Sequence, residues 1–402
     1  MEACNKKVTL TFSQGKVIQY QEQSNLAFLL LVKSQRAEEP LDLEELMKYP
    51  LMPVPPSLGT PDGFFSKTNK AALLHYILQD TTPKDLPYPK DALFIQDGMA
   101  LLHVLTNLPP TWGNMPTTTR KPYDFKIFLT NDDNKKQLCQ LLLRVWSDQQ
   151  AASRLERTEM AVLIVEGRAH QLLSSNGKVE VRELPTIYSN QEETDTRVVL
   201  YLHHAAAFGY KNAVVRTPDT DIFVILLYHA HAIKLTIYLD TGGEDCTSAF
   251  KGKGKVGPLK NLEKNPKFHR AFSQLGDNWN VKPEVLKQLE QFTCLIYGES
   301  RESSVDVVRA KLLRKMVGED DKLTAKSKVD LARLPPCYDA LKPHVQRVNH
   351  RVVLYKRADE SILEKPNPYD EEQGWMRSDG VLRPEDEEEE EFDSDDSIEN
   401  DD

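Results

Sequence analysis

The chain has 402 residues, of which 40% are hydrophobic and 28% charged, a composition ordinary for a soluble globular protein of one large domain or two smaller ones. The formal charge of −10 is concentrated at one end, because residues 385–402 contain 13 acids and no Lys or Arg. The remaining 48 acids and 51 bases give the body a charge near +3. A nearly neutral body neither requires a nucleic-acid partner nor argues against one.

The cysteines and the apolar runs indicate the compartment. Five scattered cysteines lack CxxC spacing, which indicates reduced thiols in an intracellular protein and leaves no zinc motif: Cys4, Cys139, Cys246, Cys294 and Cys337. The apolar run LAFLLLV (26–32) is too short to span a bilayer and lacks a signal-peptide pattern. We therefore expect a nuclear or cytoplasmic protein that is not secreted and makes no membrane contact.

Residues 1–90 are predicted to form a proline-rich N-terminal arm. The stretch YPLMPVPPSLGTPDG (49–63) cannot hold a long helix, because each proline removes a backbone donor and restricts the residue before it. We expect an extended arm with short helices, wrapped on the rest of the chain.

Residues 91–345 are predicted to form an α/β domain with a helical extension. Apolar strands alternate with helices, which indicates a doubly wound, mainly parallel sheet flanked by helices. The expected strands are ALFI (92–95), MAVLIVEG (160–167), NAVVR (212–216) and KLTIYLD (234–240), and the expected helices cover 131–152, 195–209 and 222–232. From about residue 246 the pattern is mostly helical. Residues 346–384 indicate a linker, and 385–402 a disordered acidic tail.

Acidic residues gather where these strands end and helices begin, which is where α/β sheets bind ligands. Asp97 follows the first strand, Glu193 and Asp195 open a helix, and Asp219 and Asp221 follow NAVVR. An extended DTD would point both carboxylates to one side, where they repel each other unless a cation lies between them. Mg²⁺ or Mn²⁺ suits such oxygen ligands.

Each acid also has an ordinary structural interpretation. Glu193 and Asp195 would be favourable at a helix N-terminus through the helix dipole and capping. Asp219 would serve as a turn residue, and Asp97 or Asp221 as a helix cap. The occurrence of three acidic clusters at strand ends or helix starts of one domain favours a shared metal site.

A basic, glycine-rich loop follows the last strand. After Phe250, residues 251–270 carry seven Lys or Arg and the single acid Glu263. Glycine backbone amides can approach a phosphate closely, and lysines add charge without sequence preference. The phosphate contacts predicted for this loop are Lys251, Gly252, Lys253, Gly254 and Lys255. The alternative is a solvated loop, and the spacing is not that of a P-loop.

Several stretches of the sequence resemble motifs of a known nuclease family. EETDTRVVLYLHHAAAFGYKNAVVRTPDTDIFVILL resembles the acidic core of PIN-like nucleases of the flap-endonuclease type, and FIQDGMALLHVL is similar to their first acidic motif. EDCTSAFKGKGKVG resembles their glycine–aspartate motif and the loop that grips the DNA backbone. LDLEELMKYPLMPVP and TSAFKGKGK also resemble a large group of animal proteins, many of them related to mobile elements.

The resemblance implies a PIN-like domain that hydrolyses phosphodiesters of DNA or RNA with water and without a protein nucleophile. It implies that Mg²⁺ or Mn²⁺ is held by Asp97, Glu193, Asp195, Asp219 and Asp221, with Asp245 as a further ligand. Two departures leave an alternative open: LDTGG runs straight into EDC, and GGEDC replaces the usual glycine–cysteine–aspartate order. The alternative is a catalytically inactive PIN-like protein that binds nucleic acid or acts as a scaffold.

Two other enzyme classes fit the sequence less well. A glycosyltransferase could use the DTD stretch for a metal and a nucleotide sugar, but Asp97 and EETD would then have no role. A phosphatase with Asp219 as nucleophile would be expected to continue as DGT, whereas this chain continues as DIF from Asp221.

Overall fold

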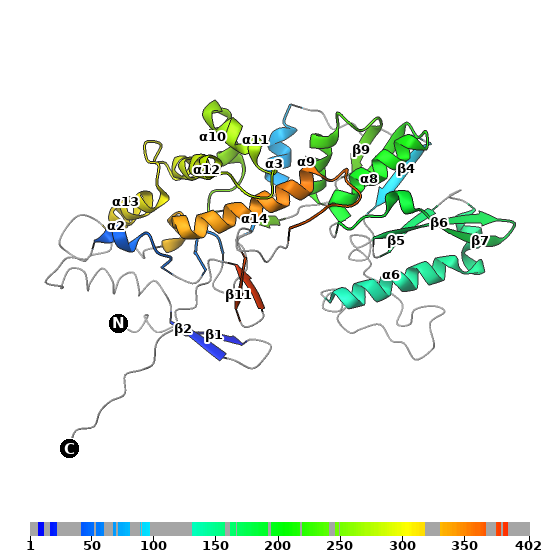
Figure 1. Cartoon of the computed structure of the whole chain (residues 1–402), viewed down its shortest axis with the longest axis horizontal. Coiled ribbons are helices and arrows are strands. Elements are labelled where there is room, and N and C mark those ends of the chain that lie inside the picture. The colour runs from blue at the N-terminus through cyan, green and yellow to red at the C-terminus, as the bar shows by residue number, and fades with distance from the viewer. Residues whose placement is uncertain are drawn as a thin grey trace, which may run out of the picture. The chain divides into compact units, whose positions relative to one another are not determined.

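The computed structural model forms two compact units (Figure 1). The first combines Met1–Asp80, Cys246–Val353 and Lys365–Asp402, and the second combines Thr81–Asp245 and Leu354–Glu364. The structure describes residues 7–11, 17–21, 42–51, 54–59, 67–69, 71–80, 89, 91–96, 131–156, 161–165, 167–191, 194–217, 219–240, 246–248, 250–317, 330–366, 375–378 and 381–384. The acidic tail at 385–402 and the candidate ligand Asp97 lie outside these residues.

A three-stranded parallel sheet lies in the second unit. Its strands are β4 (Ala92–Gln96), β8 (Asn212–Arg216) and β9 (Thr236–Asp240), in the order β4-β8-β9. The pairing aligns Gln96 with Arg216 and Arg216 with Asp240, so all three strands end at one edge. All three strands were predicted from their apolar residues, and the α/β class is confirmed.

Two helices cover one face of this sheet. Helix α8 (Thr194–Ala207) and helix α9 (Thr220–His229) pack against the face that carries Ala213 and Val215. Both helices were predicted. A doubly wound sheet would reverse its strand order, but the described strands follow chain order without such a reversal.

The strand predicted at 160–167 belongs to a separate antiparallel sheet and not to the parallel one. Strands β5 (Ala161–Val165), β6 (Arg168–Ser175) and β7 (Lys178–Glu183) form this meander. The two-residue turn at Asn176 and Gly177, both with positive φ, joins β6 to β7. A connection this short fits an antiparallel hairpin, whereas parallel strands need a crossover of a dozen residues or more.

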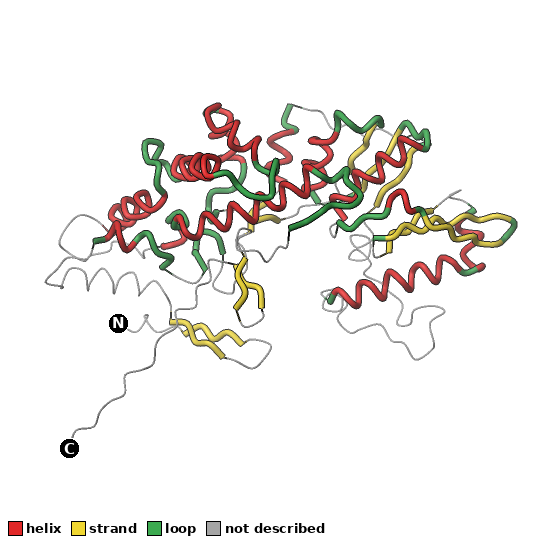
Figure 2. Tube along the Cα trace, in the orientation of Figure 1, coloured by secondary structure: helices red, strands yellow, loops and turns green. Residues whose placement is uncertain are grey.

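Helix α6 (Asp132–Ser147) lies beside the antiparallel sheet, as Figure 2 shows. Its N-cap is Asn131, whose side chain accepts hydrogen bonds from the amides of Asp133 and Asn134, so the predicted start is confirmed. Leu143 and Trp146 pack with Leu172 of β6. The short helices that complete both units are η2 (Gln149–Ala151), α7 (Ala152–Leu155), η3 (Pro185–Ile187), η4 (Pro266–Phe268) and η5 (Leu331–Arg333).

The first unit is mainly helical, as the sequence predicted for residues beyond 246. Its helices are α10 (Val256–Glu263), α11 (His269–Gln274), α12 (Pro283–Ile296), α13 (Val305–Val317) and α14 (Tyr338–Lys356). An apolar cluster joins α11, α12, α13 and α14 through residues such as Leu289, Val308 and Leu341. The last residues of α14 belong to the second unit, which begins again at Leu354.

N-terminal segments pack on these helices. Helix α2 (Leu43–Leu46) precedes Met47, which is buried with Ala310 and Leu313 of α13. The remaining elements of this unit are β1 (Lys7–Thr11), β2 (Val17–Gln21), β3 (Lys67–Asn69), α3 (Ala71–Ile77), β10 (Cys246–Ser248), β11 (Trp375–Ser378) and β12 (Val381–Pro384). Strand β3 pairs with β10, β1 with β2, and β11 with β12, all antiparallel.

The unit boundaries differ from those expected. The region 346–384, expected as a linker, includes the end of α14 and the β11–β12 hairpin. Residues 354–364 join the core of the second unit through Tyr355 and Ala358. Within the described residues, no helix is long and apolar enough to cross a membrane.

Candidate functional site

The carboxyl end of strand β8 leads directly into helix α9 through a ladder of hydrogen bonds. The amide of Thr217 donates to the carbonyl oxygen of Asp240, 3.0 Å away, and continues the β8–β9 pairing beyond the strands. The hydroxyl of Thr217 accepts the amide of Asp219 at 3.0 Å. The Asp219 carboxylate then accepts the amide of Asp221 at 2.8 Å. The backbone amides of Thr217, Asp219 and Asp221 are therefore each held by a hydrogen bond.

The two acids do not share one face of a strand, so that part of the sequence interpretation is corrected. Asp219 is extended, with φ −85° and ψ 121°, and is the N-cap of α9, whereas Asp221 lies in the first helical turn. A helix start leaves backbone N–H groups without partners, and the Asp219 carboxylate satisfies one of them. The sequence analysis allowed Asp221 to be a helix cap, but the cap of α9 is Asp219.

Asp221 has a partner from a distant part of the chain. The hydroxyl of Tyr355 donates to Oδ2 of Asp221 at 3.1 Å. The backbone carbonyl of the same tyrosine accepts a hydrogen bond from Nε2 of the buried His229, at the end of α9, at 2.9 Å. Tyr355 therefore contacts both ends of α9. All these residues belong to the second unit.

A further carboxylate stands at the same edge of the sheet. Asp240 ends strand β9, and its Oδ2 lies 2.8 Å from Nε of Arg216, the last residue of β8. The side chains of Arg216 and Asp240 are about half and one-third exposed, 51% and 32%. In the register, Arg216 is also aligned with Gln96 of β4, and Asp97 follows Gln96 in the sequence. The Arg216 guanidinium and the Asp240 carboxylate therefore lie at the edge from which the chain leads to Asp219 and Asp221.

The remaining predicted metal ligands are placed only in part. Asp195 is half-buried in the first turn of α8, where its charge suits the helix dipole. Asp97, Glu193 and Asp245 lie outside the described residues. Among the residues that are described, no group of three or more His, Cys, Asp or Glu side chains lies close enough to hold a metal ion.

The glycine-rich loop uses backbone conformations that favour glycine, and one of the lysines predicted to contact phosphate packs inward. Gly252 and Gly254 have φ of +76° and +61°, so the loop uses the left-handed conformation that glycine permits. Lys251 is exposed, and Lys255 is the N-cap residue of α10. Nζ of Lys253 instead lies 4.1 Å from the centre of the Tyr297 ring, and partial burial lowers the pKa of this lysine. Lys253 therefore packs inward.

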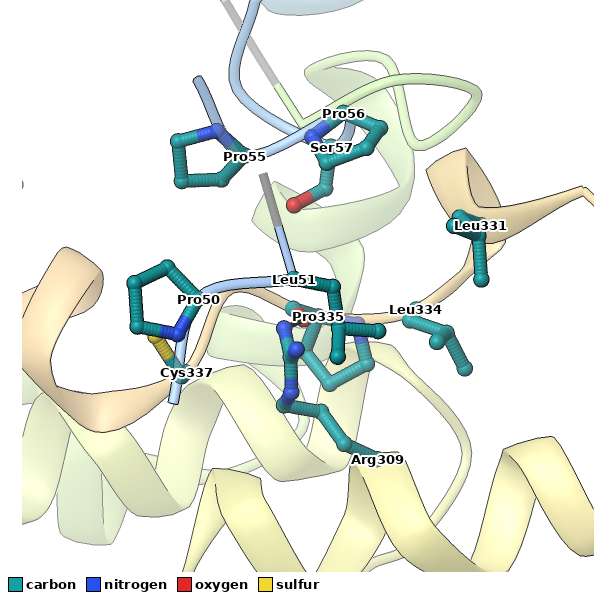
Figure 3. Close-up of a pocket in the computed structure, with 10 residues that line it drawn as sticks. All are labelled: Pro50, Leu51, Pro55, Pro56, Ser57, Arg309, Leu331, Leu334, Pro335 and Cys337. Carbon is teal, nitrogen blue, oxygen red and sulfur yellow. Dashed lines mark hydrogen bonds between the residues drawn. The ribbon is translucent and has the colours of Figure 1, made fainter. Parts of the chain in front are cut away.

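A buried arginine is one of the residues that line a small cavity in the first unit (Figure 3). Arg309 of α13 is 4% exposed, and it donates to the carbonyl oxygens of Met47 at 3.0 Å, Pro335 at 2.7 Å and Tyr49 at 3.4 Å. Burial lowers the pKa of its guanidinium. The cavity volume is about 10 Å³, room for one water molecule at most. The arginine thus ties the N-terminal segment to α13 and lines no substrate pocket.

Sequence reasoning did not single out Asp240, Tyr355 or Arg309. Asp240 carries the signal that identified Asp97, an acid at the end of an apolar strand. Tyr355 carried no signal, because 134 residues separate it from Asp221. Arg309 stands in VDVVRAKLL, where nothing in the sequence separates this buried cation from the partly exposed Lys311.

Comparison of the chain with protein-family models, with curated proteins and with solved structures gives no match. The resemblance to PIN-like nucleases therefore rests on the sequence motifs alone.

Proposed function

We propose that the chain is a PIN-like, metal-dependent nuclease that hydrolyses phosphodiesters of DNA or RNA at the carboxyl edge of the β4-β8-β9 sheet. The observation that carries the proposal is the strand register, which ends β4, β8 and β9 at one edge, at Gln96, Arg216 and Asp240. Asp97 follows the first of these strands in the sequence, and Asp219 and Asp221 follow the second. Ligands of open parallel sheets bind at this edge.

The donor chemistry fits Mg²⁺ or Mn²⁺. Asp219 and Asp221 would supply hard carboxylate oxygens from a turn in which backbone amides donate to the side chains of Thr217 and Asp219. Asp97, Glu193 and Asp195 would complete the set, with Asp245 as a further ligand. A bound divalent ion supplies positive charge to the phosphate oxygens and lowers the pKa of water.

The chain's own residues would bind and orient the substrate. The carboxylates of Asp219 and Asp221 would hold the cation, and the proposed hydrolysis needs no protein nucleophile. In the first unit, Lys251 and the backbone amides of Gly252 and Gly254 would contact nucleic-acid phosphates. Contacts of this kind carry no base preference, which favours a substrate defined by its backbone.

Cleavage assays on branched and single-stranded DNA and RNA, with Mg²⁺ or Mn²⁺, test the proposal. The double variant Asp219→Asn and Asp221→Asn keeps the capping geometry but removes both charges, so cleavage should fall by at least roughly 100-fold. Glu156→Gln, which changes an exposed acid of the same unit, should cut normally. Cleavage that persists in the double variant would refute the site.

A catalytically inactive scaffold is the second candidate. It is favoured by the structural roles of both acids, because Asp219 caps α9 and Asp221 accepts the hydroxyl of Tyr355. Calorimetric titration with Mg²⁺ separates the two candidates. Absence of binding near millimolar Mg²⁺ would favour the scaffold, and saturable binding would favour the nuclease.

A further inference from the structure

Helices α10 and α11 carry a group of exposed cations on the first unit. Both helices contact α12 (Figure 1). Phe268 and Ala271 are 2% and 1% exposed, and the rings of Phe268 and Phe272 lie 5.3 and 4.9 Å from that of Phe292 of α12, so the inward side is apolar. On the exposed side of the same segment lie four cations, here called the basic face: Lys260, Lys264, Lys267 and Arg270.

The basic face has almost no acids of its own. Between residues 251 and 276, Glu263 is the single acid, and its carboxylate accepts the hydroxyl of Tyr76 at 2.8 Å. Among the described residues, no carboxylate forms an ion pair with a cation of the basic face. Helix α13 of the same unit differs, because Nζ of its exposed Lys315 lies 2.6 Å from a carboxylate oxygen of Glu299. The described part of the chain therefore leaves the basic face without a counter-charge.

The same chain carries an excess of acids beyond Pro384. The 18 residues 385–402 include 13 acids and no Lys or Arg. Strand β12, which ends at Pro384, belongs to the first unit, as do α10 and α11. An extended segment of this length spans about 60 Å, whereas a compact domain of about 200 residues is only about 45 Å across. The acidic tail is therefore long enough to reach the basic face.

We propose that the acidic tail, residues 385–402, binds the basic face of its own chain through ion pairs. Acids crowded along one segment repel one another, and cations at short range remove that repulsion. A single exposed ion pair favours contact by a factor of only roughly 1.5 to 5. Attachment to the same chain raises the effective concentration of the tail to the millimolar range, so several weak pairs suffice. The contact involves no metal and no hydrolysis, so it stands apart from the proposed function.

The tail is favoured over a polyanion from outside the chain, such as nucleic acid. Both would use the same four cations, but the tail is present at the same effective concentration however dilute the protein is. An outside polyanion must first displace the tail, which makes the basic face less accessible than its exposed side chains suggest.

Zero-length carbodiimide crosslinking of the full chain, followed by mass spectrometry, tests the contact, because it joins only carboxylates and amines that touch. The link between Lys315 and Glu299 is the internal control and should form in any folded sample. Links from the tail to the lysines of the basic face should exceed those to Lys282 and Lys342, exposed lysines of the same unit, by at least about fivefold. At 1 M salt, where the screening length falls to about 3 Å, this excess should disappear.

Two matched variants test which cations hold the tail. Lys264→Gln with Lys267→Gln removes two cations of the basic face, and Lys282→Gln with Lys342→Gln removes two exposed cations of the same unit outside it. The first variant should lower the yield of links between the tail and Lys260 by at least about twofold, and the second should leave it unchanged. Circular dichroism and thermal unfolding check that both variants keep the fold.

Three results would overturn the proposal. Tail links spread evenly over all exposed lysines, with the link between Lys315 and Glu299 formed, would show that the basic face is only solvated. Tail links found only between differently labelled copies of the chain would show that the tail binds a second copy. If the tail forms no links and added single-stranded DNA lowers the acetylation of the lysines of the basic face, its occupant is an outside polyanion.

Discussion

The two units use their central charged groups in opposite ways. In the first unit, Arg309 is 4% exposed, and three backbone carbonyls accept its N–H groups. In the second unit, Asp219 and Asp221 are only half-buried, at the end of a strand, where Asp219 caps a helix and Asp221 accepts from Tyr355. The first arrangement fixes a cation inside a fold, and the second keeps acids at an edge.

The two arrangements predict different effects of mutation in the two units. Removing a buried charge that is hydrogen-bonded on several sides leaves its partners without hydrogen bonds in a medium that cannot replace them. Changing a half-buried carboxylate costs little stability, because water replaces the lost contact. We therefore expect changes at Arg309 to affect stability, and changes at Asp221 to affect ligand binding.

The largest effect is expected for Arg309→Ala. It leaves the carbonyls of Met47, Tyr49 and Pro335 without their donor and should lower the free energy of unfolding of the first unit by about 3–5 kcal/mol. Hydrogen exchange of α13 and of residues 42–51 measures this loss. The control Arg314→Ala breaks an exposed ion pair with Glu44 and should cost less than about 1 kcal/mol. Equal losses would show that burial of the charge is not decisive.

The next effect separates two glycines of the first unit. A Cβ atom on Gly276, which has φ +78°, would lie 2.6 Å from Cγ1 and 2.8 Å from the carbonyl carbon of Val352 in α14. Gly276→Ala should therefore cost about 3 kcal/mol, from backbone strain and overpacking together. Gly252 has φ +76°, but a Cβ atom there would meet no other atom within 4 Å, so Gly252→Ala should cost only about 1 kcal/mol. Thermal unfolding of the two variants measures their losses of stability. Similar losses would show that contact with Val352 does not decide the cost at Gly276.

A smaller effect is expected at the N-cap of α9. Asp219→Ala removes the hydrogen bond to the amide of Asp221 and should lower the free energy of unfolding by about 1 kcal/mol. Asp219→Asn keeps an acceptor for this amide and should lower it by only a few tenths of about 1 kcal/mol. Chemical denaturation of the second unit measures both. If Asn destabilises as much as Ala, the charge and not the capping bond holds the turn.

The smallest effect concerns pH. Burial raises the pKa of Glu290 above its ordinary 4.5, nearby Asp306 raises it further, and the hydrogen bond from the amide of Val305 lowers it. The folded chain then binds this proton more tightly than the unfolded chain, so the free energy of unfolding falls as pH rises from 4.5 through the folded-state pKa. Glu290→Gln keeps an acceptor for Val305 and removes the charge. It should flatten the pH profile and add no more than about 1 kcal/mol at neutral pH. An unchanged profile would show that Glu290 does not titrate in this range.

Much of the second unit was predictable because its signals are local. The apolar strands at β4, β8 and β9 and the start of helix α6 depend on neighbouring residues, and the structure confirms them. The antiparallel meander was missed because a strand that is apolar on both faces fits either pairing direction. The geometry of Asp219 and Asp221 was mistaken because a DTD stretch fits a strand and a helix cap equally well.

The contacts of Tyr355 and Arg309 could not be predicted for a different reason. Tyr355 reaches Asp221 across 134 residues, and Arg309 reaches Met47 across 262. Neither partner lies in the neighbouring sequence, so no spacing reveals them. The same holds for the unit boundaries, because residues 354–364 return to the second unit after a helix that belongs mainly to the first.

Anomalous diffraction from a crystal of the full chain with Mn²⁺ shows whether a divalent cation binds at the carboxyl edge of the β4-β8-β9 sheet. If it does, we expect an anomalous peak within coordination distance, about 2.2 Å, of a carboxylate oxygen of Asp219 or Asp221. A crystal grown at saturating Mn²⁺ with no peak there, and with Asp219 still capping α9 and Asp221 still accepting from Tyr355, would contradict it.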